Sequence, residues 1–161
     1  MPDNKRQAYT KLEKTLDRIE KIVLAALIIS IVLDKLSINA LVLTELAVGG
    51  LAVIFFFRAY APPEMNSDVK TSSFFELLIL TIIPKVLWIS CSVSAMGILF
   101  YLLQFGNEGY LQMALIGGMT MAASFILLVI SMFTKTNDLR PLYPVLIRTA
   151  PLFFMDLYIY L

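Results

Sequence analysis

The sequence predicts an all-α protein, a polytopic membrane helical bundle of about five spans, with two antiparallel hairpins in pseudo-repeat followed by a C-terminal hydrophobic helix. Of the 161 residues, 59% are hydrophobic and only 16% are charged, which is more apolar side chain than one soluble core of this size can bury. The hydrophobic residues also form separate runs near the roughly 20 residues with which a helix crosses a hydrocarbon core of about 30 Å. We therefore expect a lipid bilayer to solvate much of the chain.

The pseudo-repeat consists of residues 39–50 and 107–118, which stand 68 positions apart. Each segment begins with asparagine, opens a long apolar run and ends in a Gly-Gly pair. Because many membrane folds are built from internal repeats, we interpret each segment as the start of the second helix of a hairpin. The two copies differ at Glu45, whose equivalent is Met113.

A charged amphipathic extension, residues 1–18, leads into the first transmembrane hairpin, residues 19–60. The connection between its spans, 19–36 and 40–57, is so short that they must be antiparallel neighbours. Arg58 is expected to end the second span.

A cytoplasmic loop and an interfacial helix are expected over residues 61–85, because Pro84 disrupts a helix interior and Lys85 prefers the headgroup level. The second transmembrane hairpin is expected over 86–134, and a loop with a C-terminal membrane helix over 135–161. Within these segments the helices are expected at 74–83, 86–103, 110–133 and 143–161.

Lysine and arginine set the expected orientation. Six of the thirteen lie at or before the start of the first span, four more fall in connections on the same side, and only Lys35 lies opposite. The positive-inside rule then predicts that the N-terminus lies in the cytoplasm and, with five spans, that the C-terminus lies on the opposite side of the membrane.

Glu45 is the leading candidate for a functional group, because an ionisable residue costs about 2.5–3.5 kcal/mol at the centre of a membrane helix. It is either a structural carboxylate that pairs with Lys35 or Ser30 across the hairpin, or a proton or cation site. Two other cations, Lys85 and Arg148, are further ion or structural-charge candidates that can reach the headgroups by snorkelling.

Small and hydroxylated residues mark two helix faces for close packing. These residues are Ala114, Gly118 and Ala122 on one helix and Ser90, Ser94 and Gly97 on another. An apolar stripe on the N-terminal extension consists of Tyr9, Leu12 and Leu16. This stripe either lies against lipid headgroups or the protein's own loop, or docks a membrane protein partner subunit.

No catalytic constellation is visible. The chain has no histidine, and its single cysteine, Cys91, lies in an apolar run, so the commonest acid–base and metal-binding groups are missing. We expect no enzymatic activity, no metal or cofactor and, at a net charge of +1, no nucleic-acid partner. The favoured function is a non-catalytic accessory or scaffold subunit of a larger membrane complex. The alternative is a small oligomeric transporter or ion-conducting protein that uses Glu45.

A family resemblance rests on the second hairpin and the last helix. The residues that carry it are Gly97 to Phe100, Gln104, Asn107, Leu111, Gly117 and Leu146 to Arg148. They are similar to a group of small multi-pass membrane proteins of gliding bacteria, to which no activity is assigned. The resemblance implies that the membrane is a bacterial cytoplasmic (inner) membrane, with the C-terminus then expected in the periplasm. Their hairpins resemble, more distantly, the membrane hairpin of the ion-driven motor subunit of gliding motility and type 9 secretion.

The motor family has a His-Trp-Pro-Gly-like turn and an acidic residue deeper in its second helix. In this chain the turns at 37–39 and 105–107 read Ser-Ile-Asn and Phe-Gly-Asn, and Glu45 comes too early along the helix. The motor's proton-coupling role is therefore not transferred to Glu45.

Overall fold

The computed structural model describes residues 3–36, 38–60, 78–105, 108–133 and 143–160. These residues are helical apart from short turns and contain no strand, which confirms the predicted all-α helical bundle. The helices are α1 (Asp3–Lys35), α2 (Leu41–Tyr60), α4 (Ile83–Leu102), α5 (Gly109–Phe133) and α6 (Tyr143–Tyr160), with a π-helical turn η1 (Leu78–Ile82) before α4.

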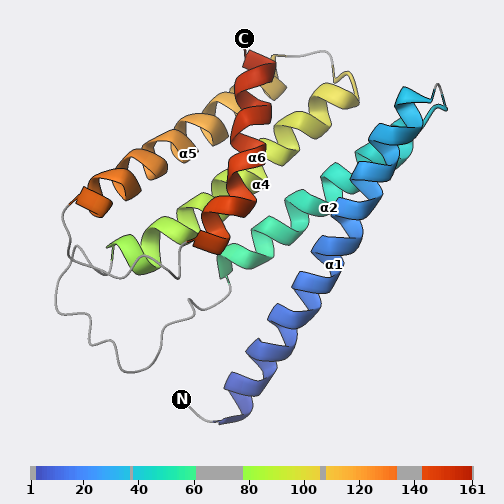
Figure 1. The fold of residues 1–161 in the computed structure, drawn as a ribbon. Coiled ribbons are helices and arrows are strands. Elements are labelled where there is room, and N and C mark those ends of the chain that lie inside the picture. Colours follow the sequence, from blue (N-terminus) through green and yellow to red (C-terminus); the bar gives the residue numbers. More distant parts are fainter. Residues whose placement is uncertain (1–2, 37, 61–77, 106–107, 134–142, 161) are drawn as a thin grey trace.

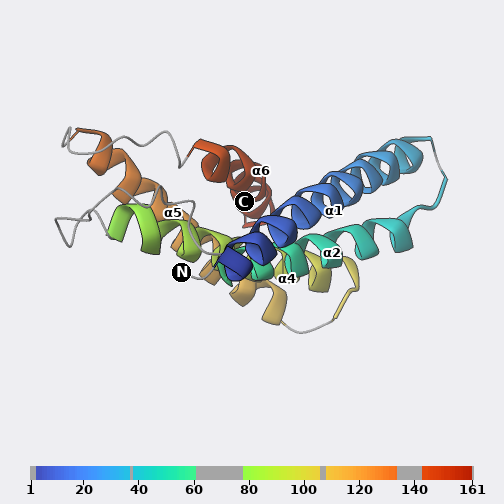
Figure 2. The ribbon, with the colours of Figure 1, turned by 90° about the horizontal axis from the view of Figure 1, so that it is seen from below.

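Two antiparallel hairpins lie side by side in the bundle (Figure 1). The helices α1 and α2 form one hairpin, α4 and α5 form the other, and α2 packs against α4 to join them. The last helix, α6, crosses one face of the second hairpin and contacts both α4 and α5 (Figures 1 and 2). The N-terminal end of α6 lies at the same end of the bundle as the C-terminal end of α2 (Figure 1).

Three of these helices are long and apolar enough to cross a membrane: Leu41–Tyr60, Ile83–Leu102 and Gly109–Ser131. Large apolar side chains also stay exposed on the outside of the bundle, as at Ile28, Val42, Ile116 and Phe154. An exposed apolar surface of this extent is typical of a protein that faces lipid. The chain is a membrane protein.

The helix α4 is the centre of the bundle. In the 18-residue apolar stretch of α4, 56% of the residues are buried inside the protein, against 28% in that of α5. Its Ser92 hydroxyl donates to the Ala52 carbonyl of α2 at 2.8 Å, and its Cys91 Sγ lies 3.6 Å from Met121 Sδ of α5. The central helix thus bonds or packs to both neighbours along its length.

Two helix boundaries differ from the sequence expectation. Arg58 does not end the second span, because α2 continues to Tyr60 and Arg58 is buried inside the bundle. Pro84 and Lys85 do not divide two helices either, because Pro84 lies in the first turn of α4, where its missing N–H costs no intrahelical hydrogen bond. The turn η1 runs directly into α4, and residues 74–77 of the expected interfacial helix lie outside the described residues.

Glycines allow α4 and α5 to approach closely. A Cβ added at Gly97 would lie 3.0 Å from the Ala114 nitrogen and 3.1 Å from the Tyr110 carbonyl oxygen. One added at Gly117 would lie 3.0 Å from the Ser90 oxygen and the Ser94 nitrogen. This seam of backbone-to-backbone contact is the small-residue packing by which helices associate in lipid.

The glycine contacts are not the same in the two hairpins. Gly50 faces its own hairpin partner through Val23 of α1, whereas Gly49, the sequence equivalent of Gly117, faces Leu99 of α4. The helices of both hairpins are present, but the pseudo-repeat itself stays a prediction.

We predict that Gly97→Leu lowers the free energy of unfolding by about 1–3 kcal/mol, the usual cost of overpacking a close contact. The nearest atoms at this position are two backbone atoms and the Met113 Cβ, none of which is the far end of a flexible side chain. Unfolding in detergent micelles on addition of sodium dodecyl sulfate, followed by the fluorescence of Trp88, measures the change. Gly109→Leu is the control, because a Cβ at Gly109 meets nothing within 4 Å. Equal stability of the two variants would argue against the glycine seam.

Candidate functional site

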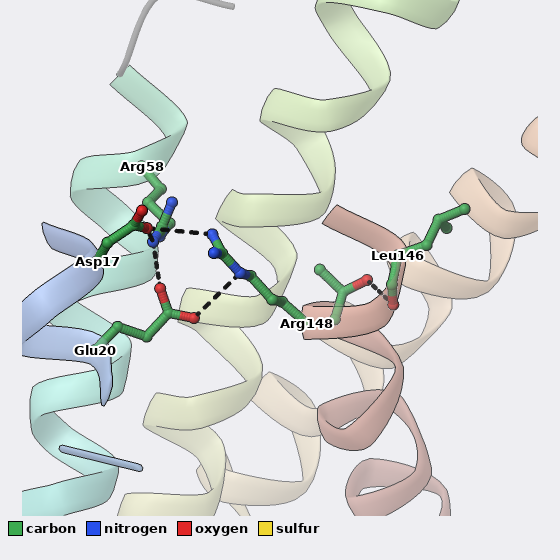
Figure 3. A network of polar contacts seen from close by, with 6 residues as sticks. Asp17, Glu20, Arg58, Leu146 and Arg148 are labelled. Atoms are coloured by element: carbon green, nitrogen blue, oxygen red, sulfur yellow. Dashed lines mark hydrogen bonds and ion pairs between the residues drawn. The ribbon is translucent and has the colours of Figure 1, made fainter. Parts of the chain in front are cut away.

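Four charged side chains from three helices meet at the end of the bundle where α2 ends and α6 begins (Figure 3). Arg58 of α2 forms hydrogen-bonded ion pairs with Asp17 and Glu20 of α1. Arg148 of α6 approaches the same two carboxylates, with Nη1 3.4 Å from Asp17 Oδ1 and Nε 3.7 Å from Glu20 Oε1. We call these four residues the charge network.

The local sequence explains how the charge network forms. Asp17 and Glu20 are three residues apart on α1, so both carboxylates project from one helix face. Arg58 comes from the last turn of α2, which is antiparallel to α1 and so brings the guanidinium to the same level. Its guanidinium carbon lies 5.2 Å from the centroid of the Trp88 ring, within cation–π distance.

Aromatic packing supports this position of Arg58. The Trp88 ring stacks on Phe55 with centroids 5.6 Å apart, so one side of the guanidinium is covered by a ring that is itself fixed. The side chains of Arg58 and Glu20 are only 8% and 5% exposed, whereas those of Arg148 and Asp17 are 34% and 39% exposed. The network therefore has a buried pair at its centre and a partly exposed pair at its rim.

The balance of charge in the network determines how the network affects the stability of the fold. Two carboxylates face two guanidinium groups, so no net charge is left uncompensated in the network. A buried ion pair adds little net stability when it forms, but removing one partner is strongly destabilising because the other charge stays buried. The network thus makes the register of α1, α2 and α6 difficult to change.

The same charges control the protonation of Asp17. Burial by itself would raise the pKa of Asp17, but the hydrogen bond from Arg58 and the charges of Arg58, Arg148 and Lys21 together lower it. Asp17 therefore stays ionised under conditions in which an ordinary aspartate begins to take up a proton.

A second polar cluster lies among α4, α5 and α6. The Asp156 carboxyl of α6 is 4% exposed and accepts a hydrogen bond from the Ser94 hydroxyl of α4 through Oδ2. A Cβ at Gly118 of α5 would lie 3.7 Å from this oxygen, so the glycine leaves room for the carboxyl. The other oxygen, Oδ1, is buried and has no hydrogen-bond partner in the described part of the chain.

Glu45, the leading candidate from the sequence, lies apart from both clusters. It is half-buried and lines an open groove of about 760 Å³ along α1 and α2, which is also lined by Leu99 of α4 and by Leu103, just after α4. Among the described residues no ion pair or hydrogen bond joins Glu45 to Lys35 or Ser30, and the Ser30 hydroxyl donates to the Leu27 carbonyl at 2.7 Å instead.

The other residues singled out in the sequence lie at several places. Ser90, Ser94, Gly97 and Ala114 are buried in the α4–α5 contact, Ala122 is half-buried, and Lys85 is half-buried in the first turn of α4. Leu16 is 7% exposed and lines the same groove as Glu45, and its role in docking a partner stays a prediction. Tyr9 and Leu12 lie on α1, but their side chains are outside the described part.

Sequence reasoning missed both clusters. It treated Arg58 as a charge at the end of a span and Arg148 as a snorkelling cation, and it did not single out Asp156. The partners of Arg58 are 41 and 38 positions away, and no local periodicity reports such a distance. One signal was available in the sequence. The carboxylates of Asp17 and Glu20 stand three residues apart at the start of an apolar run, and a single arginine stands near the same end of each of two other helices, Arg58 in α2 and Arg148 in α6.

In comparisons with known proteins, no family model, no curated protein and no solved structure matches this chain. The resemblance to membrane proteins of gliding bacteria stays a prediction.

We predict that Arg58→Met lowers the free energy of unfolding by about 3 kcal/mol, the lower end for breaking a buried pair, because Arg148 still compensates part of the charge. Chemical unfolding in lipid–detergent micelles measures the loss. Arg18→Met is the matched control, since it removes the same charge from an exposed position next to Asp17 and should change stability by no more than about 0.5 kcal/mol. Adding Glu20→Gln to Arg58→Met should recover part of the loss. Equal losses for Arg58→Met and Arg18→Met would contradict a structural role for the network.

We also predict an acid-dependent loss of stability from Asp17. Its folded-state pKa lies below the unfolded value of about 3.9, so ionised Asp17 stabilises the fold above about pH 4. That contribution disappears as the pH falls through the folded-state pKa. Unfolding measured from about pH 6 downward should show a steeper fall below about pH 4 in the wild type than in Asp17→Asn. Identical pH profiles would show that Asp17 is not held by the network.

Proposed function

We propose that this protein is a non-catalytic accessory or scaffold subunit of a larger membrane complex, placed in a bacterial inner membrane with its N-terminus in the cytoplasm. The observation that carries the proposal is α1, a single continuous helix whose N-terminal part extends past the rest of the bundle (Figure 1). The charge network holds α1 at the point where this helix leaves the bundle (Figure 3). A rigid arm of this kind suits attachment to another protein.

Length supports this interpretation of α1. Its 33 residues correspond to about 50 Å of helix, well beyond the roughly 30 Å of a hydrocarbon core. The part from Asp3 to Asp17 accounts for about 21 Å of this length and lies on the N-terminal side of the network. Because Arg58 and Arg148 hold Asp17 and Glu20, the direction of the arm is fixed relative to α2 and α6.

The exposed side of the arm is basic. Lys11, Lys14, Arg18 and Lys21 are all exposed, and their spacing of three, four and three residues places them on one helix face. Leu16 and Glu20, which are buried, lie on the opposite face. These four residues form a basic stripe that begins on the arm and continues past the charge network. The expected partner is a membrane protein subunit with an acidic cytoplasmic surface.

The transport alternative has less support. All but two of the side chains that line the groove beside Glu45 are apolar or absent, the exceptions being Thr15 and Glu45 itself. Ion conduction needs a path with polar or charged groups at successive positions, and the groove offers one carboxylate.

Site-specific photocrosslinking in the cell that naturally makes the protein tests the proposal. A photoreactive residue at Lys14 should capture one membrane protein that also copurifies at a fixed ratio in mild detergent. The same residue at Met119, which is exposed on α5, is the control and should capture lipid alone. Changing Lys11 and Arg18, both exposed, to glutamate should release the partner without unfolding the bundle. Recovery of the isolated protein, or capture that survives this charge reversal, would contradict docking through the basic stripe.

A further inference from the structure

The buried carboxyl of Asp156 has an arrangement that neither the charge network nor the proposed scaffold role accounts for. Its neighbour Ser94 is the twelfth of the 20 residues of α4, so the carboxyl lies near the middle of a helix that is long enough to cross the membrane. Ionisable groups at this depth are costly and mark functional sites by default.

No positive charge compensates Asp156 within the described residues. Arg148, on the same helix, lies eight residues or about 12 Å away and is engaged with Asp17 and Glu20. On α4 the titratable groups are the buried thiol of Cys91, with Lys85 and Tyr101 toward the two helix ends. The described part of α5 contributes only Tyr110, in its first turn. An ionised Asp156 would therefore be a buried charge with one neutral donor, the Ser94 hydroxyl.

A metal ion does not fit this site. Hard cations such as Ca²⁺ take about six to eight oxygen ligands. The side-chain oxygens gathered here are the Asp156 carboxyl and the Ser94 hydroxyl, and helix carbonyls nearby are engaged in their own backbone hydrogen bonds. A proton, which needs only one oxygen, is the ligand that this geometry accommodates.

We propose that Asp156 is a proton-binding site inside the membrane, with the proton on the unpartnered Oδ1 and Ser94 as the positioning residue that donates to Oδ2. In the binding step a hydronium ion transfers its proton to the carboxylate and leaves as water, which gives a neutral carboxylic acid. The neutral acid lets α6 dock on α4 and α5 without a buried charge. This site is independent of the basic stripe on α1, so either proposal can fail alone.

Infrared spectroscopy of the full chain in lipid vesicles tests the proton directly. At about pH 7, exposed carboxyls, with ordinary pKa values near 4, are ionised, whereas a protonated acid shows a separate C=O stretching band. We expect that band in the wild type and in Glu45→Gln, and its loss in Asp156→Asn. In Ser94→Ala the band should remain but move in frequency, because the hydrogen bond to Oδ2 is gone.

A measurement on the wild type alone covers the case in which Asp156→Asn does not fold. Carbon-13 labelling of all aspartates should shift the acid band at about pH 7, since Asp17 stays ionised through Arg58. Absence of the band, or a band that aspartate labelling does not move, would overturn the proposal.

Discussion

The ion pairing of Arg58 with Asp17 and Glu20 is the interaction on which the arrangement of the helices depends. It joins α1 to α2 across the first hairpin, and Arg148 extends it to α6 at the far end of the chain. Both α1 and α6 are at the edge of the bundle and are less apolar than the three helices that qualify as membrane spans. Apolar contacts are not directional, whereas a buried charge must keep its partner.

Lipid imposes a second constraint on the remaining helices. Helix association in a bilayer gains little from the hydrophobic effect, so close packing and buried hydrogen bonds must supply the contact energy. The seam at Gly97 and Gly117 supplies close packing, and the hydrogen bond from the Ser92 hydroxyl to α2 supplies a buried hydrogen bond. Asp156 and Ser94 use the space that this close packing creates, because Gly118 leaves room beside the carboxyl.

The sequence predicted the fold class and most helices because lipid selects long apolar runs, and such runs are local features. It placed the end of α2 too early, since an arginine at the edge of an apolar run resembles a loop charge until its buried partners are known. It favoured Glu45, which lies in an apolar groove without a partner among the described residues. Asp156 was passed over because its partner, Ser94, is 62 positions away, and only tertiary packing brings the two together.

The central claim is that the charge network fixes α1 against α6. The most direct test is the distance between spin labels at Lys14 on α1 and Tyr143 on α6, both exposed, measured by pulsed dipolar spectroscopy in lipid nanodiscs. Cys91 is fully buried and should not take up label. A single narrow distance distribution is expected in the wild type and in Arg18→Met, and a broad one in the double variant Arg58→Met/Arg148→Met, which removes both cations of the network. A broad distribution in the wild type, or an unchanged narrow one in the double variant, would contradict the claim.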